Sequence, residues 1–234
     1  MHFLITAGGT REYIDPVRFI SNTSSGRMGY ALARAAVSAG HKVTVIAAPT
    51  IEQPPRKAKI VRVETTAQMF EAVRKYFPVC DCLIMAAAVA DYTPARKSKV
   101  KIKKAKKNLI IRLKPTVDIL AWAGKHKHER RATSDEPRFV VGFALEDKAI
   151  QTHAEKKLKE KNLDMIIANT PAAIGAEEST VQIKCKTDKW IKLPAAPKAQ
   201  TAQKIIRFIC EKSEARNPKK IQISNFQNGN NRHL

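Results

Sequence analysis

The chain has 234 residues, 44% of them hydrophobic, and its 43 Lys and Arg against 21 Asp and Glu give a formal net charge of +22. This length and apolar content predict one compact domain with a full hydrophobic core and exclude a disordered chain. No apolar run reaches the ~18 residues of a membrane span, and the opening MHFLITA lacks the basic start of a signal peptide. We therefore expect a cytoplasmic protein with no membrane contact, whose charge attracts polyanions.

The cysteine pattern fits the same compartment. Cys80 and Cys82 flank the start of an apolar segment, and Cys185 and Cys210 stand alone. A structural zinc site needs a second cysteine pair or histidines at suitable spacing, and neither accompanies Cys80 and Cys82. We expect four reduced thiols that take part in packing.

Residues 3–36 form the stretch around which the fold is expected to be organised. An apolar strand at residues 3–6 breaks at Gly8-Gly9, where a backbone without Cβ can turn sharply. A polar loop leads to Ser24-Ser25-Gly26, and the apolar residues that follow recur at the spacing of one helix face. The positive end of that helix, preceded by hydroxyl donors, predicts a binding site for an anion such as phosphate.

This motif differs from the two common phosphate loops. Gly8-Gly9 is followed by Thr10 and a long loop, which does not complete G-x-G-x-x-G, and no Gly-Lys-Ser/Thr follows as in a P-loop. On local sequence alone, Ser24-Ser25-Gly26 is equally compatible with a plain helix N-cap. Both interpretations stay open at this level.

Strands and helices alternate along the rest of the chain. Strands are predicted at residues 42–48, 60–63, 83–89, 139–143 and 165–168, with helices between several of them, a late β-hairpin at 180–186 and 190–193, and a closing helix around 202–209. This alternation indicates an α/β fold with a doubly wound, mostly parallel, Rossmann-like sheet. Residues 1–215 form the single predicted domain, and 216–234 a polar, basic, frayed tail.

A basic flap, at about residues 92–116, follows the strand at 83–89. That strand is predicted to run directly into Asp91, and ligands of doubly wound sheets bind beyond the carboxyl ends of the strands. Apolar residues interrupt the lysines of the flap, and residues 109–113 have the pattern of a returning strand, which predicts a hairpin arm. Most of its lysines are expected to be solvated, with one or two directed at phosphates.

Two later segments contain candidate site residues. Residues 117–120 open a helix, with Asp118 suited to its first turn. A helix at 147–162 places Lys161 on its apolar face, with Lys157 one turn before it. In the basic segment 125–138, His126 and His128 point to different sides of a helix, so solvated positions are favoured over a metal site.

A series of motifs resembles phosphopantothenate–cysteine ligase (phosphopantothenoylcysteine synthetase) of coenzyme A biosynthesis. The motifs, in order over about residues 3–210, are GGTREYIDPVRFISNTSSGRMGYALA, AAAVADY, KIKK, VDIL, VGFALED, KNLDMIIAN and IGAEES. In many bacteria this enzyme is the C-terminal half of a bifunctional protein that begins with a flavin-dependent decarboxylase. Because Met1 directly precedes the first strand, we expect the decarboxylase to be a separate chain.

The resemblance implies amide-bond formation between 4'-phosphopantothenate and L-cysteine. It implies CTP as co-substrate, with ATP possible, and Mg²⁺ bound through the nucleotide. The carboxylate would form an acyl-cytidylate with release of pyrophosphate, and the cysteine amine would then displace CMP. Helix-terminal N–H groups and lysines suit the charge that develops in such steps. The family also implies a homodimer in which the flap reaches the partner.

The resemblance assigns roles to residues. Asn22 would contact the acyl intermediate through an amide that does not titrate, and Lys101 would close over the triphosphate. Asp91 would lie near the nucleotide or its Mg²⁺. The remaining residues implied to bind nucleotide or phosphate are Gly8, Gly9, Ser24, Ser25, Gly26, Met85, Ala86, Ala87, Val117, Asp118, Ile119, Leu120, Phe143, Lys157 and Lys161. The plainer alternatives are a turn residue for Asn22, a strand-end cap for Asp91 and a core residue for Phe143.

Two motifs depart from the family pattern. The usual Asn-Pro-Asp-Ile becomes Thr116-Val117-Asp118-Ile119, which leaves the local backbone contact open although Asp118 is kept. The usual Gly-Phe-Ala-x-Glu-Thr ends here in Asp147, a change that can alter the cap of the next helix.

Two other classes of function share some of these features. An NAD(P)-binding oxidoreductase of the short-chain type would share the opening strand and the sheet, but none of the four tyrosines has a lysine four positions later, as its catalytic Tyr-x-x-x-Lys pair requires. A nucleic-acid-binding protein would explain the charge, but aromatic residues make up only 6% of the chain and do not interleave with the lysines for base stacking. We therefore expect no specific nucleic-acid binding.

Overall fold

The structure is a computed structural model that describes residues 1–106, 108–130, 136–173 and 176–216. Its centre is an eight-stranded sheet in the order β12-β11-β10-β9-β6-β1-β4-β5. Neighbouring strands from β10 to β5 are parallel, whereas β11 is antiparallel to both β10 and β12. The strands are β1 (His2–Ala7), β4 (Lys42–Ala47), β5 (Lys59–Arg62), β6 (Cys82–Met85), β9 (Phe139–Leu145), β10 (Met165–Asn169), β11 (Glu178–Cys185) and β12 (Ile191–Pro197). The predicted mostly parallel, Rossmann-like sheet is confirmed.

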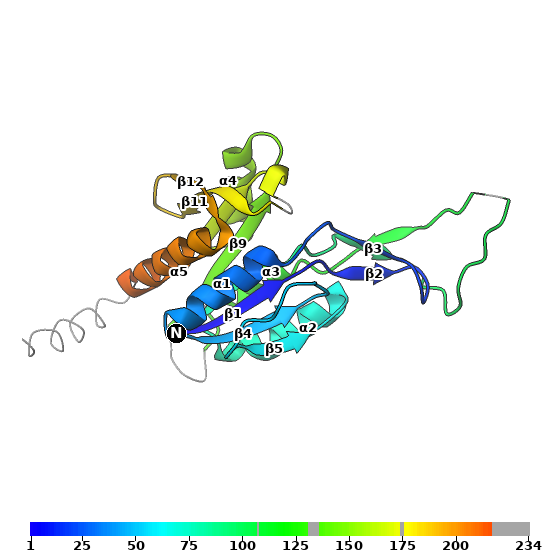
Figure 1. Cartoon of the computed structure of the whole chain (residues 1–234), viewed down its shortest axis with the longest axis horizontal. Coiled ribbons are helices and arrows are strands. Elements are labelled where there is room, and N and C mark those ends of the chain that lie inside the picture. The colour runs from blue at the N-terminus through cyan, green and yellow to red at the C-terminus, as the bar shows by residue number, and fades with distance from the viewer. Residues whose placement is uncertain (107, 131–135, 174–175, 217–234) are drawn as a thin grey trace, which may run out of the picture.

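Helices cover both faces of this sheet (Figure 1). They are α1 (Arg27–Ser38), α2 (Thr66–Tyr76), α3 (Ile119–His126), α4 (Ile150–Glu160) and α5 (Lys198–Ala215), with short 3-10 helices η1 (Phe77–Val79) and η2 (Pro171–Ala173). Helices α1 and α5 bury Tyr30 and Ile205 in the hydrophobic cluster on one face. Helices α2, α3 and α4 bury Met69, Leu120 and Leu158 in the cluster on the other. The winding is therefore double, as predicted, and a ligand can approach the sheet only at the edge where the strands end.

The predicted glycine loop joins β1 to the segment that precedes α1. Gly8 has a φ of +85° and Gly26 a φ of +76°, in the left-handed region that glycine adopts without strain. A Cβ on Gly8 would lie 2.7 Å from the carbonyl oxygen of Ala48. A Cβ on Gly29, inside α1, would lie 2.6 Å from the Cβ of Ala7 at the end of β1. Because Gly8 and Gly29 have no side chain, the start of α1 can lie directly against the end of β1.

Strand β6 is shorter than the strand predicted at residues 83–89. Beyond β6 the N–H of Ala87 donates to Thr6 Oγ1 at 3.1 Å, and the N–H of Ala88 donates to the Gly8 carbonyl at 2.9 Å. The prediction of a continuous strand was wrong because a side-chain hydroxyl and the glycine loop replace the regular ladder. The chain after β6 is thereby held against the loop after β1.

Two small hairpins form an arm, defined here as residues 10–23 and 92–116, that projects from the sheet (Figure 1). Strands β2 (Arg11–Tyr13) and β3 (Phe19–Ser21) pair within the segment predicted to be a polar loop, so that prediction missed a hairpin. Strands β7 (Tyr92–Pro94) and β8 (Leu113–Pro115) pair at the base of the flap. The hairpin flap is confirmed, but the return strand predicted at 109–113 begins only at its last residue. Lys107 lies outside the described residues.

The late hairpin and the closing helix are also confirmed, as β11, β12 and α5. Arg216, assigned to the frayed tail, is instead packed at the end of α5. Its guanidinium donates to Asp164 Oδ1 at 3.0 Å and lies over the Phe139 ring at 4.6 Å. The rest of the predicted tail, residues 217–234, lies outside the described residues.

The basic segment 125–138 contains two buried cations. Lys127 is buried and donates to Asp164 Oδ1 at 2.6 Å. Arg138 is buried as well and donates through Nε to the Phe77 carbonyl at 2.7 Å. Residues 131–135 of this segment lie outside the described residues. Buried cations that have partners anchor this corner of the fold, since removing one partner of such a pair is strongly destabilising.

The close contact of α1 with β1 gives a first prediction. Gly29→Ala places a Cβ 2.6 Å from the Ala7 Cβ, so the helix must shift. Overpacking of this kind lowers the free energy of unfolding by about 1–3 kcal/mol, partly offset by the better helix propensity of Ala. Urea denaturation measures the change. Ser38→Ala, in the exposed last turn of α1, is the control and should stay within about 0.5 kcal/mol; equal stability of the two variants would contradict the contact.

Candidate functional site

A cleft of about 760 Å³ opens at the carboxyl ends of β6, β9 and β10, between the first turns of α1 and α3. This is the edge at which doubly wound sheets bind their ligands. Most of the residues selected from the sequence line it, namely Asn22, Ser24, Ser25, Gly26, Met85, Ala86, Ala87, Asp91, Val117, Asp118, Ile119, Leu120, Phe143, Lys157 and Lys161. Gly8, Gly9 and Lys101 do not line it.

The start of α1 forms one wall of the cleft. Its N-cap residue is Gly26, which has no side chain to accept a capping hydrogen bond, so the simple serine N-cap is not formed. The Ser25 hydroxyl accepts a long hydrogen bond of 3.4 Å from the N–H of Arg27, while the Ser25 carbonyl accepts one of 2.6 Å from the Thr50 hydroxyl. An uncapped helix N-terminus with two neighbouring hydroxyls favours an anion at this wall.

Gly8 and Gly9 lie behind this wall. A Cβ on Gly9 would lie 2.8 Å from the carbonyl oxygen of Asn22, and one on Gly26 would lie 3.4 Å from the nitrogen of Gly8. The two glycines therefore permit the loops to approach each other, and they do not face the cleft.

Asn22 connects the two sides of the cleft. Its Nδ2 donates to the Val89 carbonyl at 3.0 Å, across the gap between the loops that follow β3 and β6. The carboxamide has a second N–H and an acceptor oxygen that can serve a ligand. Ala86 and Ala87 lie beside it, and because the Ala87 N–H is engaged by Thr6, the small side chains rather than that N–H give a ligand close access.

Asp91 stands exposed at the rim, where the flap leaves the sheet. Its carbonyl accepts from the N–H of Thr116 at 2.9 Å, and the Thr116 hydroxyl donates to the Ala90 carbonyl at 2.6 Å. Thr116 thus fastens the base of the flap. Asp118 then begins α3 as its N-cap and accepts from the Ala121 N–H at 2.9 Å, one position outside the first turn in which it was predicted.

Lys157 of α4 and Lys161, the C-cap residue of this helix, form the opposite wall. Lys161 Nζ lies 2.7 Å from Asp118 Oδ2, and Lys157 Nζ lies 3.9 Å from Glu146 Oε1. Burial lowers the pKa of Lys157, and the charge of Lys161 lowers it further. Burial is the largest single influence and works to raise the pKa of Asp118, but the hydrogen bonds from Lys161 and the Ala121 N–H together with the charges of Lys161 and Lys157 outweigh it, and the net shift is downward. Adjacent, partly desolvated cations of this kind are suited to a polyanion.

Lys101 lies on the arm, away from the cleft of its own chain. The neighbouring Ile102 is fastened to the β2–β3 hairpin, because its N–H donates to Asp15 Oδ2 at 3.1 Å and its carbonyl accepts from Arg18 at 2.7 Å. Asp15 is fully buried, and its hydrogen bond with Arg18 holds its pKa well below the usual range. The structure therefore keeps Lys101 apart from the other predicted site residues.

Several residues of the cleft were missed. They are Arg27, Tyr92, Leu145, Asn169, Ser179 and Lys198. Asn169 could have been found, because it directly follows the apolar run of β10, just as Asp91 follows the run that begins in β6. Ser179 and Lys198 have no such local signal, since the pairing of β11 with β12 brings them to the cleft.

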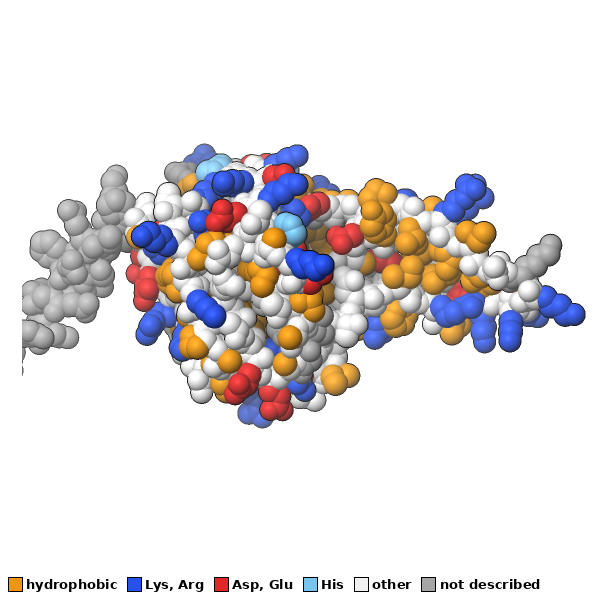
Figure 2. Space-filling model, turned by 90° about the horizontal axis from the view of Figure 1, so that it is seen from above, with side chains coloured by type: hydrophobic (Ala, Val, Ile, Leu, Met, Phe, Trp, Pro, Cys, Tyr) orange, Lys and Arg blue, Asp and Glu red, His pale blue; other side chains and the backbone are white. Residues whose placement is uncertain are grey.

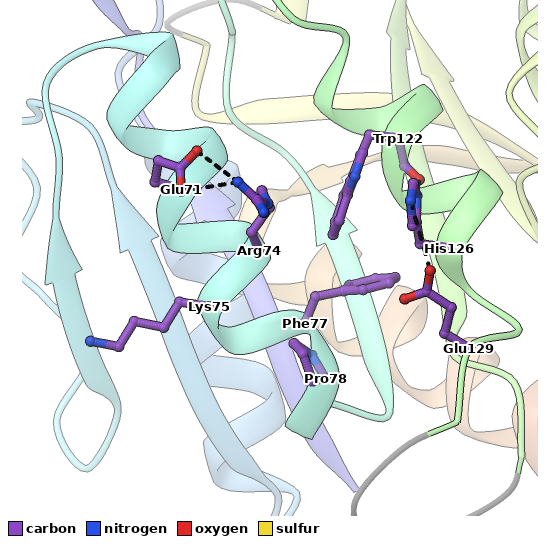
Figure 3. Close-up of a pocket in the computed structure, with 8 residues that line it drawn as sticks. All are labelled: Glu71, Arg74, Lys75, Phe77, Pro78, Trp122, His126 and Glu129. Atoms are coloured by element: carbon purple, nitrogen blue, oxygen red, sulfur yellow. Dashed lines mark hydrogen bonds and ion pairs between the residues drawn. The ribbon is translucent and has the colours of Figure 1, made fainter.

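A second cavity, of about 480 Å³, lies between η1, α2 and α3 (Figure 3). His126 stacks on Trp122 with ring centroids 4.5 Å apart, so this histidine is half-buried rather than solvated as expected, whereas His128 is exposed. Arg74 pairs with Glu71 at 3.2 Å, and His126 lies 3.7 Å from Glu129. The Arg74–Glu71 ion pair occupies two of the charged groups that line this cavity, and the residues predicted to bind nucleotide line the cleft instead.

Metal and membrane features are limited in the described part of the chain. No group of three or more His, Cys, Asp or Glu side chains is arranged there as metal ligands. Cys80, Cys82, Cys185 and Cys210 are free thiols, as expected, and burial raises the pKa of Cys82. None of the described helices combines the length and the apolar character needed to cross a bilayer.

Comparison with known families decides where the chain belongs. The model of the DNA/pantothenate metabolism flavoprotein C-terminal domain family matches residues 1–212. The chain belongs to this family. It is 41% identical over 218 residues to the coenzyme A biosynthesis bifunctional protein CoaBC of Bacillus subtilis, covering 91% of this chain and 52% of that protein. It is 43% identical over 210 residues to a cysteine/cysteine sulfinic acid decarboxylase of an unknown prokaryotic organism, covering 88% of this chain and 56% of that protein.

Solved structures agree with this assignment. The crystal structure of the C-terminal domain of CoaBC matches with a TM-score of 0.78 at 38% identity, covering 92% of this chain and 96% of that one. A Cab2 mutant crystallised with phosphopantothenate-cysteine shares the fold, with a TM-score of 0.75 at 17% identity over 92% of this chain and 86% of that one. The chain spans about half the length of the curated relatives named above, and the match to the CoaBC domain structure is nearly complete.

The anchor between the arm hairpins gives a second prediction. Asp15→Asn removes the charge that holds Arg18 and presents an N–H₂ donor toward the N–H of Ile102. Because a hydrogen bond to a charged group contributes about 1.5–3 kcal/mol, trypsin should cleave after the lysines of residues 97–106 roughly tenfold faster. The depressed pKa of Asp15 means that the wild-type anchor persists below the usual carboxyl pKa of ~3.9 and fails only as the pH falls through the lowered value.

Glu71→Gln is the matched control, because it breaks the exposed pair with Arg74 on α2 and leaves the contacts of Asp15 with Arg18 and Ile102 in place. Arm cleavage in this variant should equal that of the wild type. Equal cleavage of Asp15→Asn and Glu71→Gln would show that Asp15 does not hold the arm.

Proposed function

We propose that the chain is a phosphopantothenate–cysteine ligase that uses CTP. The observation that carries the proposal is the cleft at the carboxyl edge of the sheet, where an uncapped helix N-terminus faces the lysines of α4. Membership of the family and 41% identity to a coenzyme A biosynthesis protein support a role in that pathway. The match to the cysteine/cysteine sulfinic acid decarboxylase covers 56% of that protein. The decarboxylase activity in its name therefore need not belong to the part that resembles this chain.

The proposed reaction has two steps. A carboxylate oxygen of 4'-phosphopantothenate attacks the α-phosphorus of CTP, the bond to the β-phosphate breaks, and pyrophosphate leaves. The amine of L-cysteine then attacks the acyl carbon. The bond between the acyl carbon and the cytidylate oxygen breaks, CMP leaves, and the amine nitrogen loses a proton. Both steps build negative charge on oxygen, and donors placed in advance stabilise such charge better than water that must reorganise.

In this proposal both walls of the cleft bind phosphates of the nucleotide. The N-terminus of α1 with Ser24 and Ser25 holds phosphate, and Lys157 and Lys161 neutralise the rest of the triphosphate. Asn22, held by Val89, donates to the acyl oxygen of the intermediate. Met85, Ala86, Ala87, Phe143 and the turn formed by Val117, Asp118, Ile119 and Leu120 enclose the nucleoside. The lining does not by itself distinguish a cytosine from an adenine base, so CTP rests on the family resemblance and ATP is the alternative.

Mg²⁺ fits this site as an ion bound through the nucleotide. The cleft lining includes two exposed carboxylates, Asp91 at the rim and Asp118, which pairs with Lys161, and magnesium is commonly held by one or two carboxylates together with substrate phosphates. When bound, the ion would neutralise the triphosphate and assist the departure of pyrophosphate.

The oxidoreductase alternative is weaker in this fold. Dinucleotide-binding folds place an acidic residue after their second strand to bind a ribose hydroxyl. Here β4 is followed by Ala48 and Pro49. The product of a ligase would instead pass to a decarboxylase, either as a separate chain or as the other part of a longer protein.

We also propose a homodimer joined through the arm. Hydrophobic side chains gather along the arm and Lys and Arg at its far end (Figure 2). The exposed apolar residues there include Val17, Phe19, Tyr92, Leu109, Ile110 and Leu113. Such a patch on a projecting arm favours burial against a second chain, and the arm would then carry Lys101 toward the partner's cleft. Sedimentation equilibrium tests this, since a mass of one chain at micromolar concentration would contradict the dimer.

The ligase assay tests the central proposal. The protein is incubated with 4'-phosphopantothenate, L-cysteine, Mg²⁺ and either CTP or ATP, and pyrophosphate release is measured. Release with CTP that depends on 4'-phosphopantothenate is expected. Release with ATP alone would retain the ligase and correct the nucleotide, and no release with either would end the hypothesis.

The role of Asn22 gives a separate prediction. Asn22→Asp removes the amide donor and places a carboxylate beside the Val89 carbonyl, 3.0 Å from the present Nδ2. Loss of one oxyanion donor lowers a rate by about 10²–10³-fold, and here the loss should fall on the second step. Rapid-quench measurements should therefore show near-normal pyrophosphate release without cysteine and slow formation of the amide. Equal slowing of both steps would refute the assignment.

A further inference from the structure

One end of the cleft contains a group of polar residues that the proposed reaction does not yet use. Ser179 lies opposite Ala196 in the β11–β12 ladder, and the register shifts between Ser179 and Val181. Lys198 begins α5 directly after β12, and its N–H donates to the Glu177 carbonyl at 3.1 Å. The ladder thus sets Ser179 and Lys198 side by side in the cleft wall. Bulges of this kind often re-aim a side chain next to an active site.

The Ser179 hydroxyl is an exception among the buried polar groups. The residue is only 4% exposed, and its Oγ has no hydrogen-bond partner within the described residues. A buried hydroxyl without a partner destabilises the fold by about 1–3 kcal/mol. A buried polar group without a partner calls for an explanation, and a bound ion is one such explanation. Because Ser179 lines the cleft, a phosphate oxygen is a suitable acceptor.

Lys198 supplies charge on the side opposite to α4. Helices α1 and α5 cover one face of the sheet, and α4 covers the other. Lys198 therefore approaches the cleft from the α1 side, and Lys157 and Lys161 approach it from the α4 side. Burial lowers the pKa of Lys198, and the neighbouring Arg27 lowers it further. Lysines that enter one cleft from both faces of the sheet suit a chain of several phosphates better than a single phosphate.

We propose that Lys198 and Ser179 bind the two distal phosphates of the nucleoside triphosphate, the group that leaves as pyrophosphate. The naming of this nucleotide rests on the proposed function, whereas the anion site itself rests on the geometry. Lys198 is the charged partner and Ser179 the neutral donor, opposite Lys157 and Lys161. Recognition of the nucleotide is thus divided between its two ends. Binding of pyrophosphate should depend on Lys198 and Ser179, and binding of CMP should not.

Calorimetric titration of the full chain with inorganic pyrophosphate, CTP and CMP tests this division. Lys198→Gln should weaken pyrophosphate and CTP about tenfold or more, as expected for a lost charge-assisted hydrogen bond, and CMP less than about twofold. Ser179→Ala should weaken the same two ligands by a smaller factor without lowering the melting temperature, because it removes a hydroxyl that has no partner.

Lys204→Gln is the matched control, since Lys204 is exposed on the same helix and does not line the cleft. Its titrations should equal those of the wild type. Equal weakening of CTP and CMP by Lys198→Gln, equal effects of Lys198→Gln and Lys204→Gln, or no binding of pyrophosphate by the wild type would each overturn the inference. The titrations need no turnover, so a chain without ligase activity that still shows Lys198-dependent CTP binding would reject the proposed function alone.

Discussion

The contact between the start of α1 and the end of β1 is the constraint on which the candidate site depends. Gly29 lets the helix lie against Ala7, and Gly8 and Gly26 give the connecting loops backbone angles that other residues rarely adopt. The helix N-terminus consequently reaches the sheet edge where β6 and β9 end. Its dipole can then act on a ligand at short range, where such partial charges have most effect.

Charged side chains add to the electrostatic effect of the helix N-terminus at the cleft. The chain carries a large excess of Lys and Arg, but few of these side chains line the cleft. Of the two lysines on its α4 side, Lys161 pairs with Asp118 and Lys157 lies near Glu146. Partial burial and mutual repulsion disfavour the protonated form of Lys157. A polyanion between the walls would relieve that repulsion, which links affinity for phosphate to the electrostatics of the fold itself.

Sequence patterns predicted the sheet and its double winding, because apolar periodicity and strand-end positions are local signals, whereas most of the cleft residues were predicted from the family resemblance. They did not predict the β2–β3 hairpin, whose three-residue strands are too short to show a period. Nor did they predict the burial of Lys127, since its partner Asp164 is 37 positions away in the chain. Lys101 was expected at the cleft on motif alone, and the bond between Ile102 and Asp15 shows how a distant contact decides where such a residue lies.

The central claim is that the N-terminus of α1 binds the phosphates of a nucleotide. Hydrogen–deuterium exchange of the amides in residues 24–30, followed with Mg²⁺ and either CTP or cytidine, tests it most directly. Exchange in this segment should be slower with CTP and change little with cytidine, because the phosphates supply acceptors for the helix N–H groups. Unchanged exchange with saturating CTP, or equal protection by cytidine, would contradict it.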